Sequence, residues 1–97
     1  MTKADIINEV ALATGLTKVE TEAVLEGLIN SIILSLSRGE RVDIRGFGSF
    51  LVSKKPARNA HNPATRELVR LKERFVPKFK ISKKFKEIVN NSLIRGF

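Results

Sequence analysis

The fold of this chain is decided by RVDIRGFGSF, residues 41–50. Its first half alternates polar and apolar residues, and this period of two places the apolar side chains on one face of a strand. Gly46 and Gly48, in the second half, permit a tight bend and a close approach of two backbones. The stretch therefore predicts two strands that meet at this bend, the second of which continues to about Lys55.

Residues 1–38, before this stretch, have helical spacing. A capping pattern, in which an acidic residue follows a threonine by three positions, occurs at Thr2 with Asp5 and at Thr17 with Glu20. Gly15 separates the two predicted helices, and Gly39 follows the second. In the first helix, apolar residues recur on one side, at Ile6, Val10 and Ala13.

The second helix carries an apolar stripe that is broader than one short neighbouring helix would cover. Its members are Leu25, Leu28, Ile29, Ile32, Ile33 and Leu36. A stripe of this width predicts a helix that is buried against a sheet or against a second copy of the chain.

The chain after the second strand begins with a turn-like cluster, RNAHNPATRE, residues 58–67, around Pro63. We expect a return strand over about residues 68–80 and a capped final helix over residues 82–92. The order of helix, helix, three strands and helix predicts an α+β fold with a three-stranded antiparallel sheet, in a single domain over residues 1–97.

Length and composition limit the classes of protein. Ninety-seven residues bury only roughly 60 to 70 per cent of the unfolded chain's surface, so a partner subunit would help to complete the core. No cysteine is present, so the sequence predicts neither a disulfide framework nor a thiolate metal site. The start of the chain has no signal-peptide pattern and no apolar run approaches the length of a membrane span, and we expect a cytoplasmic protein.

The charge of the chain points to a polyanion. The 18 Lys and Arg residues exceed the 10 Asp and Glu residues, for a formal net charge of +8, which favours nucleic acid or an anionic membrane surface as partner. Residues 53–84 hold eleven basic and two acidic residues, whereas the rest of the chain holds seven basic and eight acidic residues. The excess positive charge is therefore confined to the arm-like second half of the predicted sheet and the start of the last helix.

The alternation of side chains along the return strand places its basic residues on one face. The basic residues are even-numbered and share one face: Arg66, Arg70, Lys72, Arg74, Lys78 and Lys80. The odd-numbered residues form an apolar face: Val69, Leu71, Phe75 and Phe79. Lysines on an edge strand also deter aggregation, but so many like charges on one face are costly unless a polyanion neutralises them. We therefore predict a phosphate-binding surface.

Enzymatic, metal-binding and membrane functions have weaker support. His61 is the single histidine and lies in a polar loop, which is typical of a solvent-facing turn residue. The glycines around Phe47 lie between strands and do not open a helix, so they do not form a phosphate loop. The basic face lacks the Trp- or Leu-rich amphipathic helix of membrane-surface binders. We expect no enzymatic activity, no metal, no cofactor and no membrane partner.

The phenylalanines allow two interpretations. Phe47, Phe50, Phe75, Phe79 and Phe85 could stack on bases, as in proteins that bind single strands. Because Phe79 lies on the apolar parity and Phe47 and Phe50 flank the bend, we favour a role in the core.

Several short motifs, in this order, resemble the bacterial HU and integration host factor DNA-binding proteins over residues 1 to about 90. They are Met1-Thr2-Lys3, Gly39-Glu40, the bend at residues 45–50, Ala57-Arg58, Asn62-Pro63 with Thr65, and Val76-Pro77 with Phe79. HU and integration host factor are themselves examples of minor-groove architectural proteins. The resemblance implies an intertwined dimer with a helical dimerisation base over residues 1–38, a sheet over residues 39–81 and a β-arm over about residues 54–75.

The resemblance also implies roles for individual residues. Pro63 would lie at the arm tip as an apolar wedge between base pairs of double-stranded DNA, bound with little sequence specificity. The implied dimer core comprises Phe47, Phe50, Phe79, Leu28, Ile29 and Ile32. The DNA-binding residues would be Lys3, Arg45, Lys54, Lys55, Arg58, Asn59, His61, Asn62, Pro63, Arg66, Arg70, Lys72, Arg74, Lys78, Lys80, Ser82, Lys83 and Lys84. We expect a homodimer at the nucleoid, with a heterodimer containing a paralogous subunit left open.

The chain departs from the family pattern at the arm tip and before the last helix. Asn59, Ala60, His61 and Arg66 stand where the family has Thr, Gly, Arg and Gly, so two glycines that could adopt positive φ are missing. Ile81-Ser82 replaces the usual Pro-Gly, with Ser82 as a side-chain cap. Asp43 and Arg45 match positions linked to site preference in the beta subunit of integration host factor, so a sequence-preferring heterodimer subunit is the alternative function.

Overall fold

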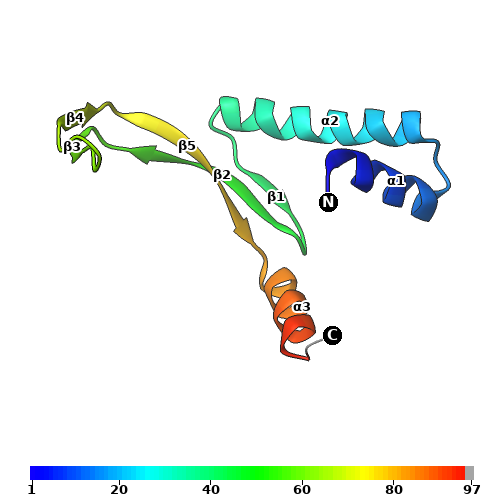
Figure 1. Ribbon diagram of the computed structural model, residues 1–97. Coiled ribbons are helices and arrows are strands. Elements are labelled where there is room, and N and C mark those ends of the chain that lie inside the picture. Colours follow the sequence, from blue (N-terminus) through cyan, green and yellow to red (C-terminus); the bar gives the residue numbers. More distant parts are fainter. Residues whose placement is uncertain (96–97) are drawn as a thin grey trace. The chain divides into compact units, whose positions relative to one another are not determined.

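The computed structural model describes residues 1–95 and divides into two compact units, Met1–Ser35 and Leu36–Phe97. The elements, labelled in Figure 1, are α1 (Lys3–Thr14), α2 (Lys18–Ser37), β1 (Val42–Ile44), β2 (Gly48–Lys55), β3 (Arg58–His61), β4 (Leu68–Leu71), β5 (Arg74–Ile81) and α3 (Lys83–Ile94). The predicted α+β class and the order of the helices are confirmed. The final helix, predicted over residues 82–92, extends two residues further, to Ile94.

Both predicted caps of the first unit are present. Thr2 and Asp5 bond reciprocally at the start of α1, and Gly15 ends the helix in the left-handed region at φ 76°. At the start of α2, the N–H of Glu20 donates to Thr17 Oγ1 and the N–H of Thr17 donates to Glu20 Oε1, each over 3.1 Å. These reciprocal bonds satisfy amides that would otherwise lack partners at the two helix starts.

The first unit buries little of its apolar surface. The buried residues of α1 and α2 are Ile7, Ala11 and Thr21. Ile6, Val10 and Ala13, which recur on one side of α1, are exposed in the protomer, with Ile6 at 38% and Val10 at 40%. Helix α2 leaves half of its predicted apolar stripe exposed as well, with Leu28 49%, Ile29 41% and Ile33 54% exposed.

The sheet in the second unit has the order β1-β2-β5, with antiparallel neighbours. In the bend between β1 and β2, Gly46 has a φ of 82°, a conformation that favours glycine. Gly48 pairs with Ile81, and a Cβ atom there would lie 2.4 Å from the carbonyl oxygen of Lys80 and 2.6 Å from the Phe79 ring. The two glycines of the bend therefore serve the two purposes that the sequence suggested, a turn and a close backbone approach.

The return strand is interrupted, which corrects the prediction of one continuous strand. It forms β4 and β5, separated by Lys72 and Glu73, and β3 pairs with β4 in a second, two-stranded sheet. Pro56 interrupts the opposite side because it has no N–H to donate to the ladder. Lys55 pairs with Arg74 and Arg58 pairs with Leu71, so two residues are skipped on each side and the register does not shift.

Four phenylalanines form a cluster over the bend. Phe50 stacks on Phe79 with ring centroids 4.6 Å apart, and Phe47 lies 5.1 Å from Phe79 and 5.5 Å from Phe85. These separations are typical of favourable aromatic pairs. Phe47, Phe50 and Phe79 thus contact one another within the protomer, but Phe47 and Phe79 are still 42% and 39% exposed, and their place in a dimer core stays a prediction.

Candidate nucleic-acid interface

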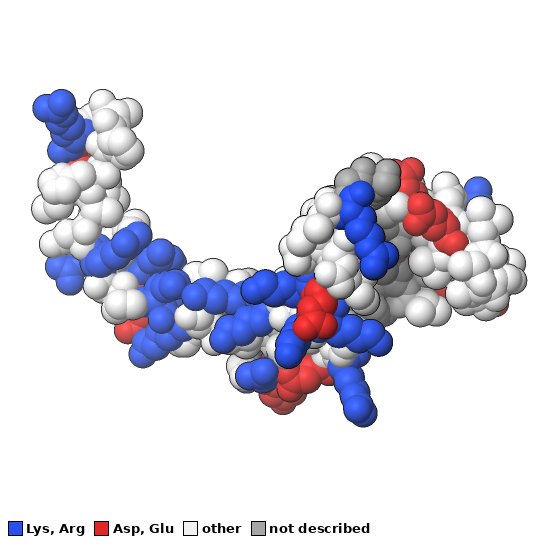
Figure 2. Space-filling view, turned by 90° about the horizontal axis from the view of Figure 1, so that it is seen from below, with Lys and Arg blue, Asp and Glu red and all other residues white. Residues whose placement is uncertain are grey.

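Basic side chains gather on the sheet and the arm of the second unit. Figure 2 shows Lys and Arg residues in a nearly continuous row along these elements, with few acidic residues among them. The register between β2 and β5 explains the row, because residues paired across an antiparallel ladder lie on the same face. Lys55 pairs with Arg74, Leu51 with Lys78 and Ser49 with Lys80, so four basic residues share that face.

Lys54 lies on the other face of the same ladder. It pairs with Phe75, and its ammonium group forms an ion pair of 3.2 Å with Glu73. The prediction treated Lys54 and Lys55 as equivalent phosphate ligands, but the alternation of the strand separates them. Lys54 reaches a carboxylate, whereas Lys55 faces other cations.

Lys55 is the centre of a basic cluster at the base of the arm. It lines a concavity of about 260 Å³ with Pro56, Arg58 and Arg74. Lys78, through its contact with Lys55, lowers the pKa of the Lys55 ammonium, and the charges of Arg74 and Arg58 act in the same direction. Among residues 1–95, no carboxylate forms an ion pair with Lys55, Arg58, Arg74 or Lys78, and a phosphate group would relieve the repulsion between these cations.

Asp43 on β1 is held by Ser49 and Arg41. Its Oδ1 accepts hydrogen bonds from Ser49 Oγ over 2.5 Å and from Arg41 Nε over 2.8 Å. The Ser49 hydroxyl, and then Arg41, lower the pKa of the Asp43 carboxyl. Arg45 lies in the bend and forms no ion pair with any residue between 1 and 95.

A second concavity, of about 430 Å³, lies beside Asp43. Arg41, Arg45 and Lys80 contribute cations to its lining, together with Ser82 at the start of α3. Arg41 was not among the predicted site residues, although it has the same parity on the first strand as Asp43 and Arg45. That parity was the available signal. The concavity is lined by three cations, from the residue before β1, from the bend and from β5, and by the Asp43 carboxylate, which is paired with Arg41.

The arm tip is a short turn closed by hydrogen bonds. The N–H of Asn62 donates to the carbonyl of Glu67 over 2.9 Å, and the N–H of Arg66 donates to the carbonyl of Asn62 over 2.6 Å. Arg66 has a φ of 60°, so it takes the left-handed conformation for which the family pattern has a glycine. Its predicted place on the basic strand face was therefore wrong, because β4 begins at Leu68.

The remaining predicted arm residues are exposed along the hairpin. Arg58, Asn59 and His61 lie on β3, Arg70 lies on β4 opposite Asn59, and Lys72 lies in the gap before β5. Pro63 is exposed at the tip. The hairpin thus presents polar and basic side chains on both of its strands around an accessible proline.

Other predicted site residues are already engaged by their own chain. Lys3 forms an ion pair of 2.7 Å with Glu26, which raises the pKa of the Lys3 ammonium. Ser82 Oγ donates to the carbonyl of Gly46 over 2.9 Å and accepts from the N–H of Phe85 over 3.1 Å, and its own N–H donates to Phe47. Ser82 therefore fixes the start of α3 on the bend and has no donor left for a phosphate.

The first turn of α3 offers more accessible cations. Lys83 is 90% exposed and lies 3.9 Å from Glu87, a separation at the limit of an ion pair. Lys84 has no ion pair within the described part of the chain. Over the described residues, no helix is long and apolar enough to cross a membrane, and no group of three His, Cys, Asp or Glu side chains could hold a metal ion.

Comparison with known proteins agrees with the geometry of the arm and the basic face. The family model described as "Bacterial DNA-binding protein" matches residues 1–90. Integration host factor subunit beta of Marinobacter nauticus is 39% identical over 98 residues, which cover 100% of both chains. DNA-binding protein HU of Thermotoga maritima is 44% identical over 89 residues, which cover 92% of this chain and 99% of the relative.

Solved structures of HU have the same fold. The Anabaena HU–DNA cocrystal structure matches with a TM-score of 0.86 and 36% identity, over 92% of this chain and 97% of that chain. HU from Thermotoga maritima matches with a TM-score of 0.68 and 32% identity, over 92% of this chain and 98% of that chain. Since the family model and these relatives span nearly the whole chain, the protein belongs to the bacterial DNA-binding family of HU and integration host factor.

Proposed function

We propose that this protein binds double-stranded DNA as a dimer and bends or compacts it, with its β-arms in the minor groove. The observation that carries this proposal is the basic cluster of Lys55, Arg58, Arg74 and Lys78, in which the other three cations lower the pKa of Lys55. Folding brings these cations together at an electrostatic cost, and a polyanion that follows the arm removes the cost. Most of the predicted site residues lie on the same unit.

The exposed apolar surface supports a dimer. Ile7 and Ala11 are the buried apolar residues among those described, and Leu28, Phe47 and Phe79 are 39% to 49% exposed. A stable monomer rarely leaves so many large apolar side chains in water. We propose that a second copy of the chain covers α2 and the phenylalanine cluster, as the family resemblance implies.

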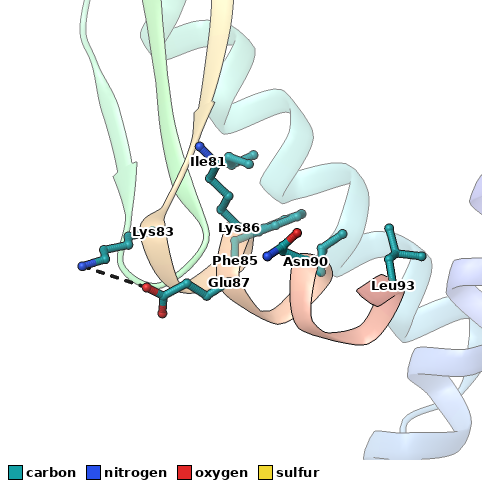
Figure 3. Close-up of a pocket in the computed structure, with 8 residues that line it drawn as sticks. Ile81, Lys83, Phe85, Lys86, Glu87, Asn90 and Leu93 are labelled. Atoms are coloured by element: carbon teal, nitrogen blue, oxygen red, sulfur yellow. Dashed lines mark ion pairs between the residues drawn. The ribbon is translucent and has the colours of Figure 1, made fainter. Parts of the chain in front are cut away.

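Helix α3 contributes a further apolar surface to this argument. A groove of about 610 Å³ runs along the helix, with Ile81, Phe85, Val89 and Leu93 among its lining residues. Figure 3 shows Ile81, Phe85 and Leu93 on one side of the view, whereas Lys83 and Glu87 point to the other side. Val89 and Leu93 are 45% and 58% exposed, so burial of these side chains against a partner subunit would stabilise the dimer.

Salt dependence tests the DNA-binding part of the proposal. If each arm and its flank neutralise about four phosphates, the slope of log affinity against log salt concentration is about −7 for the dimer. Several unrelated duplexes should give this slope, because phosphate contacts carry little sequence information. A slope near zero, or a preference for anionic vesicles over duplex DNA, would contradict the proposal.

Bending tests the role of Pro63. A kink requires partial unstacking of a base step, which a rigid apolar ring at the arm tip can offset, whereas neutralisation of phosphates does not require the tip. Pro63→Ala should therefore give a straighter complex with an unchanged salt slope. Energy transfer between dyes at the ends of a short duplex measures the bend, and equal transfer for both proteins would show that Pro63 is an ordinary turn residue.

A sequence-preferring subunit of a heterodimer is the second candidate. Relatives of the integration host factor type match this chain about as well as those of the HU type, at 39% and 44% identity. If Arg45 reads or shapes a base step, Arg45→Ala should narrow the difference between a preferred site and random duplex by about 1 to 3 kcal/mol. Equal weakening on all sequences would make Arg45 a phosphate contact only.

The proposed activity needs no catalytic group. Binding and bending require charge, shape and the wedge, so we propose that the protein is not an enzyme and uses neither cofactor nor metal. We further propose that it acts in the cytoplasm at the bacterial nucleoid, where double-stranded DNA is the abundant polyanion. Hydrolytic activity that is abolished by His61→Ala would contradict this proposal.

A further inference from the structure

Asn62 is the residue around which the arm tip closes. Its N–H donates to the carbonyl of Glu67 over 2.9 Å, and its carbonyl accepts from the N–H of Arg66 over 2.6 Å. Its side-chain Oδ1 accepts a hydrogen bond from the N–H of Ala64 over 3.0 Å. Asn62 thus binds residues on the far side of Pro63 through its backbone and its side chain.

The tip is a turn whose hydrogen bonds match those of the first turn of a helix. Asn62 corresponds to the N-cap position, Pro63 to the first helical position and Ala64 to the second, and the bond from Arg66 to Asn62 closes one turn. Asparagine is among the best residues at an N-cap. Proline is favoured directly after the cap, because the N–H that it lacks would have no partner there.

The side-chain bond restricts the rotations that matter for Pro63. The ring of a proline fixes its own φ near −65°, so the direction of the ring relative to the arm is set by ψ of Asn62 and ψ of Pro63. The bond from Ala64 N–H to Asn62 Oδ1 spans both of these rotations. Without that bond, the backbone hydrogen bonds of Asn62 to Glu67 and Arg66 alone would hold the turn, so the exposed ring would be oriented less firmly relative to β3.

We propose that Asn62 is a positioning residue whose side chain holds Pro63 in the orientation that enters the base stack, and that it acts on the DNA bend without touching a base. This inference rests on the proposed function, since it needs a tip that bends DNA. A direct contact through the free amide group, Nδ2, is the alternative. The two differ in which atom of the side chain matters, Oδ1 or Nδ2.

Two substitutions separate these atoms. Asn62→Ser keeps an oxygen that caps a helix as well as asparagine does and removes the amide donor. Asn62→Ala removes both. We expect Asn62→Ala to straighten the complex as far as Pro63→Ala does, and Asn62→Ser to bend the duplex like the parent chain. The parent chain, Asn62→Ser and Asn62→Ala should have the same salt slope, because neither substitution changes a charge.

A second measurement needs no DNA. In the free protein, amide hydrogen exchange at Ala64 should be about fivefold faster in Asn62→Ala than in the parent, and should change little in Asn62→Ser. This readout follows the turn itself, whereas a contact with DNA would not affect it. It also shows directly whether the serine hydroxyl has replaced Oδ1.

The outcomes distinguish the inference from the function on which it rests. Equal loss of bending in Asn62→Ser and Asn62→Ala, with Ala64 exchange preserved in the serine variant, would show a contact through Nδ2 and overturn the proposal. Unchanged bending in Asn62→Ala would also overturn it. Failure of the parent chain to bind duplex DNA would instead refute the proposed function, with the exchange result still reporting the turn.

Discussion

Arg66 adopts a backbone conformation that favours glycine, and the turn at the arm tip still forms. It has a φ of 60°, a region that costs a residue with a side chain about 1 to 2 kcal/mol relative to the right-handed region. The tip nevertheless closes, because the N–H of Arg66 reaches the carbonyl of Asn62. The sequence identified the missing glycine, but it did not indicate that the arginine would adopt the glycine conformation itself.

Replacing Arg66 with glycine should therefore stabilise the tip. We expect Arg66→Gly to lower the free energy of the closed turn by about 1 kcal/mol, which slows hydrogen exchange at the Asn62 amide about fivefold. Arg66→Ala is the matched control, since it removes the same charge and keeps a Cβ atom. Equal exchange in the two variants would show that the backbone at residue 66 is not strained.

At Gly48 the constraint is the lack of space for a side chain, and not the backbone conformation. A Cβ atom at this position would lie 2.4 Å from the backbone oxygen of Lys80, and the strand pairing leaves no room for that oxygen to move. Gly48→Ala should lower the free energy of unfolding by about 1 to 3 kcal/mol, as over-packing does in other proteins. Thermal unfolding measures the loss, and a change below about 0.5 kcal/mol, typical of surface positions, would contradict the close approach.

At the scale of elements, the pairing of β1 with β2 predicts the acid behaviour of Asp43. The Ser49 hydroxyl and Arg41 lower the pKa of this carboxyl below 3.8, so the stabilisation that they provide is complete above that value and is lost as the pH falls through the lowered pKa. Ser49→Ala should raise the pKa towards 3.8. Carbon NMR of the carboxyl group follows the titration, and an unchanged midpoint would show that the Ser49 bond does not persist in solution.

The arm and the sheet meet at the Lys55 cluster, where we expect DNA binding to be linked to protons. Repulsion from Lys78 lowers the pKa of Lys55 below 10.5 in the free protein. A bound phosphate favours the charged ammonium and raises that pKa again, so DNA binding should take up protons as the pH approaches the lowered pKa, and should weaken as the pH rises through it.

Lys78→Gln tests this linkage, because it removes the largest cause of the shift. The variant should take up fewer protons on binding, measured by calorimetry in buffers of different ionisation enthalpy, and its salt slope should be less steep by about 1. Its melting temperature without DNA should rise, since repulsion in the cluster is reduced. Unchanged proton uptake would show that the bound phosphate does not contact Lys55.

Local signals in the sequence predicted the elements well, and long-range contacts account for the differences. The two capping boxes, the bend glycines and the serine before α3 were read correctly because each depends on residues within a few positions. The gap in the return strand was missed because its cause, Pro56, lies on the opposite strand. The ion pair of Lys54 with Glu73 likewise joins side chains that are far apart in the sequence.

At the scale of the whole molecule, the two units bury too few apolar side chains for the single chain to be stable on its own. Their fold class, basic face and phenylalanine cluster could be predicted from periodicity and parity. The partner that covers the apolar surface could be inferred only from the excess of that surface, because one sequence carries no direct signal of what faces it. Leu28 is 49% exposed in the protomer, so a substitution at this residue tests whether a partner subunit covers it.

Leu28→Ala should behave as a core substitution although Leu28 is half exposed in the single chain. Against a partner subunit, removal of the side chain leaves a cavity and costs about 2 to 5 kcal/mol, whereas the same change on a free surface stays within about 0.5 kcal/mol. Because folding and association are linked in a dimer, the melting temperature of the parent chain should also rise with protein concentration. Thermal unfolding over a hundredfold range of concentration, with sedimentation equilibrium of the folded protein, measures both effects. A folded monomer at micromolar concentration, with a melting temperature independent of concentration and a small loss in Leu28→Ala, would contradict the dimer.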